Sequence, residues 1–342
     1  MISRLLYIFY TINLCLVIGA FTFTTLVFAQ FNSSSDVSVG ILPQNPEPYQ
    51  EVYVTMESYS IDLNSSNIRW YVNNKLVSQG VGVKKITTRV GKLGSETVVR
   101  IEVSSGVDAF TKTVSIRPTS LDILWEARTY TPPFYKGKAL FTHQSNIIFV
   151  ALPHIVSNGK EIPKENLTYT WTKNGTILGE QSGYGKYTLP LVGSIISRPI
   201  TIDVLAEDPK TGLSSFNTLS LEPQEPSILF YKNDPLYGIQ YQKAFQSTVP
   251  LSSKEIVIQA IPYFFSTPNA FSSDILSFSW SINGNKIVDG DNSLTKTFRR
   301  VGDVVGISNI SLSIEQTERI LQFSTKSLVI DFKKESASTE TF

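Results

Sequence analysis

The sequence predicts an all-β chain of three tandem β-sandwich domains, and three observations support this. A tryptophan followed by an asparagine-containing turn recurs at Trp70, Trp171 and Trp280. A Val-Gly pair follows each tryptophan 20 or 21 residues later, and an alternating apolar segment follows each pair. The apolar segments are short, rich in Val, Ile, Thr, Tyr and Phe, and broken by Gly, Pro and Asn. None keeps helical spacing for long, so each repeat is expected to be a β unit.

The first repeated element is a strand around each tryptophan that folds back in a hairpin. In the first copy Ile68, Trp70 and Val72 alternate with residues such as Arg69. Because alternate side chains of a strand share a face, we expect the tryptophan to point into the core. The residues that follow tolerate the positive φ of a tight hairpin. These turns are Asn73-Asn74, Asn174-Gly175 and Asn283-Gly284.

The later elements of each repeat also correspond. Turn glycines come next, at Gly80 and Gly82, Gly183 and Gly185, and Gly290. Alternating apolar strands follow the Val-Gly pairs, over 99–103, 200–204 and 310–314. A last strand covers 114–116, 219–221 and 328–330. Pro118 and Pro223 end this strand in the first two copies, because proline cannot donate to a ladder.

The repeats place the domain boundaries. We expect domains at 37–118, 121–223 and 226–332, with a flexible polar tail at 333–342. The linkers are only a few residues long and contain proline, which predicts stiff joints. Three such sandwiches end to end would span roughly 100 Å.

Residues 1–29 are expected to be an export signal. Arg4 supplies the positive end, 5–28 carries no charge, and cleavage is expected before Gln30. An uncleaved membrane anchor is the alternative, since the apolar stretch is long enough to cross a bilayer. The chain is therefore expected to be secreted, or to lie at the cell surface or in the periplasm. Its single cysteine, Cys15, lies in this leader, so no disulfide is expected in the domains.

Composition and motifs predict no catalytic, cofactor-binding or metal-binding residue. Lys and Arg number 30 against 29 Asp and Glu, which does not favour nucleic acid as a partner. His143 and His154 have no metal-binding spacing. Two acidic loops, 289–292 and the region of Asp203, Glu207 and Asp208, are calcium candidates with too few ligands to assign.

Aromatic residues are the remaining functional candidates. Trp125, Tyr130, Phe134 and Tyr135 cluster at the start of the second repeat. Phe230, Tyr231, Tyr237 and Tyr241 do so at the start of the third. Two interpretations stay open, packing of the joint between neighbouring domains and a site for carbohydrate or peptide.

A tryptophan on a middle strand, with about seven short strands per ~100 residues, is typical of an immunoglobulin-like β-sandwich. With its Trp-x-x-Asn-Gly hairpins and the linker Ile-Leu-Trp-Glu-Ala, the chain resembles exported bacterial tandem Ig-like and PKD-like surface proteins. The resemblance covers about 37–332. The chain departs from PKD domains in one respect, because their usual Phe-Gly-Asp-Gly sequence is absent. The resemblance implies a spacer, an adhesin or an accessory of an appendage such as a pilus.

Two functional hypotheses follow, with an enzyme as a third. The first is a non-enzymatic exported protein that links or projects surface or pilus proteins, with membrane contact only through an uncleaved 1–29. The second is an adhesin for a glycan or host protein, with its site in a loop of the third domain around Phe264 and Phe265. An enzymatic function would be tested by broad hydrolase screening, since a sandwich fold does not decide function.

Overall fold

The computed structural model describes residues 37–106, 108–195, 198–251, 253–267, 275–288, 293–302 and 305–332. Over these ranges the chain consists of β-strands and loops, with a short 3-10 turn at Lys164–Asn166. No helix in the described ranges has the length and apolar character needed to cross a membrane. The leader 1–29 with Cys15, the loop 289–292 with Gly290, and the tail 333–342 lie outside the described residues. The all-β expectation is confirmed for the rest.

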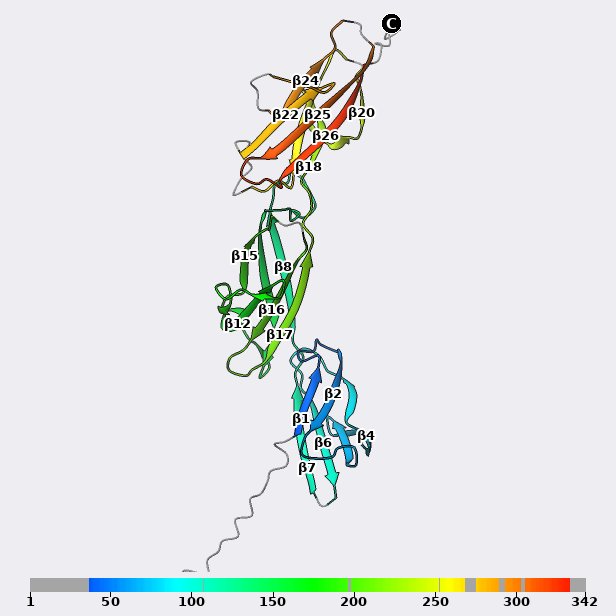
Figure 1. The fold of residues 1–342 in the computed structure, drawn as a ribbon, viewed down its shortest axis with the longest axis vertical. Helices are drawn as coiled ribbons and strands as arrows, with labels where there is room; N and C mark the ends of the chain where they lie inside the picture. Colours follow the sequence, from blue (N-terminus) through cyan, green and yellow to red (C-terminus); the bar gives the residue numbers. More distant parts are fainter. Residues whose placement is uncertain are drawn as a thin grey trace, which may run out of the picture. The chain divides into compact units, whose positions relative to one another are not determined.

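The first set of strands forms two sheets around Trp70. Its three-stranded sheet has the order β1-β2-β5 and its four-stranded sheet the order β4-β3-β6-β7. Figure 1 draws these strands in blue to cyan. The strands are β1 (Val37–Leu42), β2 (Glu51–Ser58), β3 (Asn67–Val72), β4 (Lys75–Val81), β5 (Lys85–Arg89), β6 (Thr97–Ser105) and β7 (Asp108–Ile116).

The second set repeats this arrangement around Trp171. One sheet has the order β15-β9-β8, and the other has the order β13-β12-β16-β17 with β14 also paired to β12. A small hairpin, β10 (Val156–Ser157) with β11 (Lys160–Glu161), extends from it. The strands are β8 (Ser120–Arg128), β9 (Asn146–His154), β12 (Thr168–Lys173), β13 (Thr176–Ile177), β14 (Gly183–Tyr184), β15 (Thr188–Val192), β16 (Ile200–Glu207) and β17 (Ser214–Leu221).

The third set, around Trp280, forms a four-stranded and a five-stranded sheet, one strand more in each than in the first set. The orders are β19-β18-β21-β24 and β20-β26-β25-β22-β23. The pair β20–β26 is parallel, whereas the neighbouring pairs in this set are antiparallel. The strands are β18 (Ser227–Asp234), β19 (Gly238–Phe245), β20 (Thr248–Leu251), β21 (Glu255–Tyr263), β22 (Leu276–Ile282), β23 (Asn285–Lys286), β24 (Thr295–Arg299), β25 (Gly306–Gln316) and β26 (Phe323–Phe332).

The shared sheet order describes an immunoglobulin-like β-sandwich. In each set the tryptophan strand lies in the middle of the larger sheet, beside the strand that follows the Val-Gly pair. In the first two sets, the first two strands and the strand before or at the Val-Gly pair build the other sheet. In the third set the corresponding strands are β18, β21 and β24, with β19 added at the edge. Two antiparallel sheets with this division of strands are the arrangement of immunoglobulin and fibronectin III domains.

Each tryptophan is the centre of its core. The exposed fractions of Trp70, Trp171 and Trp280 are 0%, 0% and 3%. Each indole N–H donates to a backbone carbonyl of the same sandwich, at 2.7 to 2.9 Å. The acceptors are the carbonyls of Val83, Lys186 and Ser293. A buried indole therefore keeps its hydrogen bond in all three copies, as a buried tryptophan requires.

The asparagine that starts each hairpin also has one geometry in all three copies. The φ angles of Asn73, Asn174 and Asn283 are 49°, 50° and 50°, and the following residue is also positive. Positive φ at both central residues defines the hairpin turn that matches strand twist. Each asparagine Oδ1 accepts from the backbone N–H of the neighbouring strand at 2.8 or 2.9 Å. The side chain thus extends the ladder into the turn.

The chain divides into two compact units. One contains Tyr53–Thr88, Val98–Ser115 and the strand residues up to Ile41. The other contains Leu42–Val52, Arg89–Thr97 and the chain from Ile116 onward. This second unit holds two separate hydrophobic cores, one around Trp171 and one around Trp280. The division into domains 37–118, 121–223 and 226–332 remains a prediction.

Candidate interaction site

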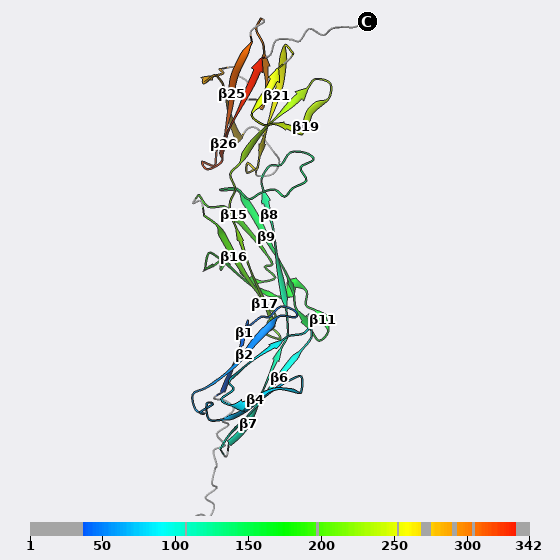
Figure 2. The same cartoon turned by 90° about the vertical axis from the view of Figure 1, so that its right-hand side faces the viewer.

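The contacts between the two sandwiches of the second unit bring together several of the predicted aromatic residues. The loop after β8 packs against the β18–β19 hairpin and the end of β21. Figure 2 labels β8, β19 and β21. Tyr130, Tyr135 and Phe264 gather here. We call this region the joint. It is built from backbone pairing, a buried polar network and an aromatic cluster.

Backbone hydrogen bonds cross the joint. The N–H of Tyr130 donates to the carbonyl of Phe265 at 2.8 Å, and the N–H of Phe264 donates to the carbonyl of Tyr130 at 2.7 Å. Thr129 forms an antiparallel bridge with Ser266. The end of β8 therefore pairs with the segment that follows β21, and the two sandwiches share a short piece of sheet.

A buried polar network lies beside this pairing. Gln322 and Thr142 are both fully buried. The Nε2 of Gln322 donates to Thr142 Oγ1 at 3.0 Å and to the His143 carbonyl at 2.5 Å, and its Oε1 accepts from the Ser266 N–H at 2.6 Å. Thr142 Oγ1 in turn donates to the carbonyl of Phe264 at 3.0 Å. A satisfied buried network of this kind fixes one arrangement of the groups it joins.

Gln144 adds a second set of bonds next to Gln322. Its carbonyl accepts from the guanidinium of Arg319, and its Oε1 accepts from the Leu321 N–H at 2.9 Å. Gln144 adopts a φ of 59°, which non-glycine residues rarely take. The strained turn aims both of its oxygens at the loop between β25 and β26.

The aromatic cluster closes the other side of the joint. Tyr231 and Tyr263 share a hydroxyl–hydroxyl bond of 2.8 Å. The ring of Tyr135 makes edge contacts with Tyr263 and Phe264, each with centroids 5.8 Å apart. Tyr130 and Tyr241 are partly buried against the same cluster. Edge-to-face contacts of this kind add to the energy of area burial.

Burial changes the acidity of these tyrosines. Desolvation raises the pKa of Tyr263, and its hydrogen bond with Tyr231 raises it further. Desolvation also raises the pKa of Tyr130 and the pKa of Tyr241. Burial therefore disfavours the phenolate form of these three tyrosines, because the charged oxygen would be poorly solvated there.

A groove of about 660 Å³ opens at the edge of the cluster. The loop 132–136 forms one side, with exposed Phe134 and half-exposed Tyr135. The other side comes from the third sandwich, with Tyr241 and Tyr263 among its residues. Lys136 is the only charged residue among the described residues that line it. The remaining lining residues are Pro132, Pro133, Ile239 and Gln242.

Phe134 is held in a conformation that costs free energy. Its φ is 66° and its side chain is 88% exposed. The N–H of Tyr135 donates to the carbonyl of Pro132, so Pro133 and Phe134 are the central residues of a β-turn. A turn with proline first and positive φ second normally has glycine or asparagine in the second place. A bulky exposed phenylalanine there gains no burial to offset the strain.

The other predicted aromatics lie elsewhere. Trp125 on β8 is partly buried against its own core, and the ammonium of Lys138 lies 3.4 Å from the centroid of its ring. Desolvation lowers the pKa of Lys138. Phe265 belongs to the core around Trp280. Trp125 and Phe265 therefore take no part in the groove.

The expectation that Phe264 and Phe265 form a binding loop needs correction. Their exposed fractions are 9% and 0%, so neither ring is presented to a ligand. The reason is the backbone pairing with Tyr130, which draws this segment into the joint. Tyr263 was not singled out by sequence reasoning, because only the fold places it beside Tyr135. The paired aromatic clusters at the starts of two successive repeats were the available signal.

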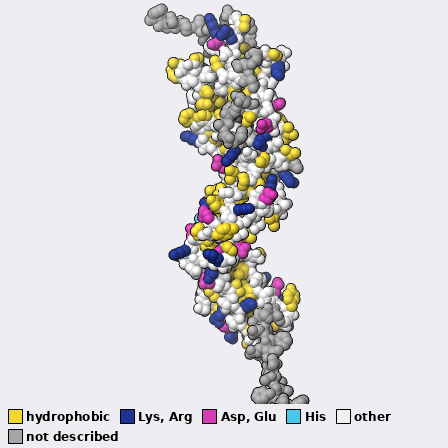
Figure 3. Space-filling model, turned by 90° about the vertical axis from the view of Figure 1, so that its left-hand side faces the viewer, with side chains coloured by type: hydrophobic (Ala, Val, Ile, Leu, Met, Phe, Trp, Pro, Cys, Tyr) yellow, Lys and Arg dark blue, Asp and Glu magenta, His cyan; other side chains and the backbone are white. Residues whose placement is uncertain are grey.

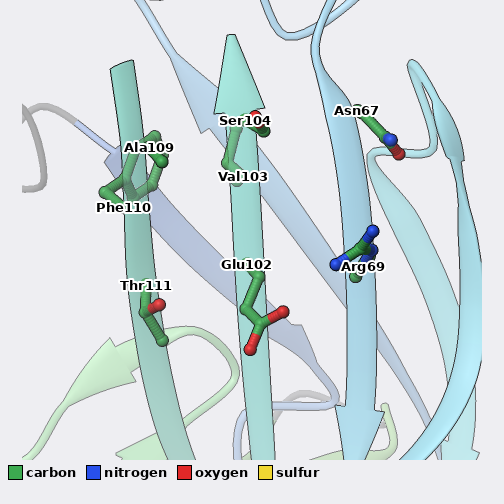
Figure 4. A pocket seen from close by; sticks show the side chains of 8 residues that line it. All are labelled: Asn67, Arg69, Glu102, Val103, Ser104, Ala109, Phe110 and Thr111. Carbon is green, nitrogen blue, oxygen red and sulfur yellow. The ribbon is translucent and has the colours of Figure 1, made fainter. Parts of the chain in front are cut away.

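A second hollow lies on a sheet of the first unit. Its volume is about 350 Å³, and β3, β6 and β7 line it. Figure 4 shows that Arg69 and Glu102 project from adjacent strands, where they are direct cross-strand partners. Glu102 also accepts from the guanidinium of Arg100, which lies over the ring of Tyr71. The other lining residues are Asn67, Val103, Ser104, Ala109, Phe110 and Thr111. These strand residues make a shallow, open polar surface.

Charged residues elsewhere are explained by local contacts. His154 Nδ1 lies 2.7 Å from Glu161 Oε1, across the turn from β9 to β11. Asp203 accepts from Thr218, and Asp208 accepts from Thr211 and the N–H of Lys210. In the described part of the chain no group of three or more His, Cys, Asp and Glu residues could hold a metal ion. Figure 3 shows both signs of charge interspersed over the face it presents.

The chain matches no protein-family model, and no curated protein matches it. Solved structures resemble it weakly. Three N-terminal domains of the bacteriophage RB49 highly immunogenic outer capsid protein align at 9% identity with a TM-score of 0.26, covering 87% of this chain and 98% of that one. The central fibronectin III array of RIM-binding protein aligns at 12% identity and a TM-score of 0.29, covering 86% and 95%.

A glycan-binding protein is also among the weak matches. The Bacteroides ovatus protein SGBP-B, solved with a mixed-linkage heptasaccharide, aligns at 9% identity and a TM-score of 0.21, covering 87% of this chain and 70% of its own. Several of these structures are arrays of immunoglobulin or fibronectin III domains. Identities and TM-scores at this level support no statement about ligands or partners.

Proposed function

We propose that this chain is a non-enzymatic, exported spacer and interaction module, in which stiffly joined β-sandwiches present partner-binding surfaces at the cell exterior. The observation that carries this proposal is the joint. Backbone pairing at Tyr130, the buried Gln322–Thr142 network and the tyrosine cluster all hold the second and third sandwiches together. A spacer needs such contacts because a flexible linker alone lets neighbouring domains reorient.

The supporting evidence for export comes from the sequence alone. The uncharged stretch 5–28 after Arg4 has the features of a signal peptide, and the only cysteine lies inside it. Intact-mass measurement of the protein purified from the cell exterior tests this part. A mass that starts at Gln30 supports cleavage. Recovery of the whole chain in the cytoplasmic fraction contradicts export.

Distance measurement between spin labels tests the spacer. With Cys15→Ser, the chain has no other cysteine, so labels at Thr188→Cys and Ser327→Cys report on one pair of sites. Both positions are exposed strand residues, one on β15 and one on β26. We expect a distance distribution as narrow as that of a control pair inside the second sandwich, Thr188→Cys with Ser220→Cys.

A single substitution distinguishes an effect on the joint from a general loss of stability. Gln322→Ala removes two hydrogen bonds across the joint, to Thr142 and His143, and one within the third sandwich, from the Ser266 N–H. We therefore expect it to broaden the distribution between Thr188 and Ser327 without broadening the control pair. The matched control is Gln246→Ala, an exposed glutamine of the third sandwich. A broad distribution of distances between residues 188 and 327 in the chain without Gln322→Ala would rule out the spacer function.

A further inference from the structure

We propose that the groove at the joint binds an acidic glycan, with Phe134 and Tyr135 as stacking rings and Lys136 as the partner of a sugar carboxylate. The proposal goes beyond spacing, because it assigns a ligand class to one surface of the module. If no acidic glycan binds, the spin-label distances are unaffected. The glycan-binding proposal and the spacer proposal can therefore be refuted separately.

The rings have the arrangement that sugar recognition uses. Phe134 is 88% exposed, while Tyr135 is braced from behind by its edge contacts with Tyr263 and Phe264. Pyranose rings carry apolar C–H faces that pack on aromatic rings, and hydroxyls that need polar partners. The groove supplies both kinds of residue, since Tyr241 and Gln242, which carry polar groups, also line it.

The strained turn at Phe134 favours a role of its exposed ring in ligand binding. A positive φ of 66° is costly for phenylalanine, and asparagine or glycine would make the same turn at less cost. Residues held in such conformations cluster at ligand-binding sites, where the surrounding structure over-determines them. Here the two preceding prolines and the hydrogen bond from Tyr135 to Pro132 fix the turn.

Charge complementarity selects the class of glycan. Lys136 is exposed and forms no ion pair within the described part of the chain, and the described lining residues include no acidic side chain. A carboxylate of a hexuronic or sialic acid would supply the missing counter-charge. A proline-rich peptide would also fit an aromatic groove, but it would leave Lys136 without a partner.

Calorimetric titration of the full chain tests the proposal. The probes are tetragalacturonate, an oligoguluronate and sialyllactose, against neutral galactotetraose and a proline-rich peptide. We expect at least one acidic sugar to bind at least about tenfold more tightly than the neutral one, and added salt to weaken it. We expect Phe134→Asn to weaken it at least about fivefold, and Lys136→Gln to remove the preference for acidic sugars.

A matched control uses Tyr237→Ala, which removes another exposed aromatic ring, 77% exposed against 88% for Phe134, from a residue of the third sandwich outside the groove. Its affinity should equal that of the unmodified chain. Circular dichroism spectra of the variants should superimpose, because Phe134 and Lys136 are exposed. The proposal is overturned if no acidic sugar binds, if the neutral sugar binds equally well, if the proline-rich peptide is the tighter ligand, or if Tyr237→Ala weakens binding as much as Phe134→Asn.

Discussion

At the scale of single residues, the three repeats preserve hydrogen bonds as well as apolar packing. Each buried indole donates to a carbonyl, and each turn asparagine accepts from the neighbouring strand. A phenylalanine could fill much of the indole volume but could not donate. The sequence pattern therefore repeats a tryptophan, because its carbonyl partner would otherwise be left unsatisfied.

For this reason Trp171→Phe should destabilise the second sandwich by about 1–3 kcal/mol, mainly by leaving the carbonyl of Lys186 unpaired. Denaturant unfolding of the full chain, followed by circular dichroism, measures the loss. Trp125→Phe is the comparison, since Trp125 is only partly buried and donates no hydrogen bond that the structure records. It should cost less than about 1 kcal/mol. Equal losses from the two variants would refute this assignment of the indole N–H.

A second prediction concerns the turn at Phe134. Phe134→Asn should leave the free energy of unfolding unchanged or raise it by up to about 1 kcal/mol, because asparagine tolerates positive φ and the phenylalanine ring is exposed. Tyr135→Asn should instead lower it, since the Tyr135 ring contacts Tyr263 and Phe264. Thermal unfolding of the two variants side by side provides the measurement. A clear loss of stability in Phe134→Asn would show that the ring is structural.

At the scale of elements, hairpins and strands could be predicted because their signals are local. Positive φ at Asn73 and its two equivalents follows from residue type, and alternation places the tryptophans inward. The joint could not be predicted in detail, because its contacts link residues more than 100 positions apart, such as Thr142 with Phe264. Sequence reasoning identified the aromatic clusters but assigned Phe264 and Phe265 to an exposed loop, since nothing local reveals their pairing with Tyr130.

The tyrosine cluster gives the joint a pH dependence at the alkaline end. The folded pKa of Tyr263 is raised above its unfolded value of about 10, so the stabilisation is fully present below pH 10. It is lost as the pH rises through 10 towards the folded pKa, because the unfolded chain releases the proton first. Unfolding measured from pH 9 to pH 11.5 should show this loss, with a shallower decline in Tyr263→Phe. If the free energy of unfolding falls with pH in parallel for the two proteins, Tyr263 is not a source of the pH dependence.

At the scale of the whole molecule, the second and third sandwiches are held together by contacts inside the second unit. The short proline-containing linkers predicted a stiff connection between neighbouring sandwiches. The structure shows how the second and third are connected: their backbones pair over a short segment, and Gln322 accepts a hydrogen bond from that segment. The same contacts create the groove, because its walls come from both sandwiches. Loosening the joint should therefore lower the affinity of the groove for a ligand. It should also broaden the distribution of distances between the second and third sandwiches. Gln322→Ala should therefore lower ligand affinity and broaden the spin-label distances, although Phe134 and Lys136 are unchanged.

Hydrogen exchange at the backbone amides of Tyr130 and Phe264 tests the central claim most directly. Both amides lie outside the named strands, in segments that would exchange rapidly if the two sandwiches moved independently. We expect them to be protected to an extent similar to the strand amide of Trp171, because each donates across the joint at 2.8 Å or less. Exchange as fast as that of the exposed loop amide of Gly137, which donates no hydrogen bond that the structure records, would show that the two sandwiches move independently.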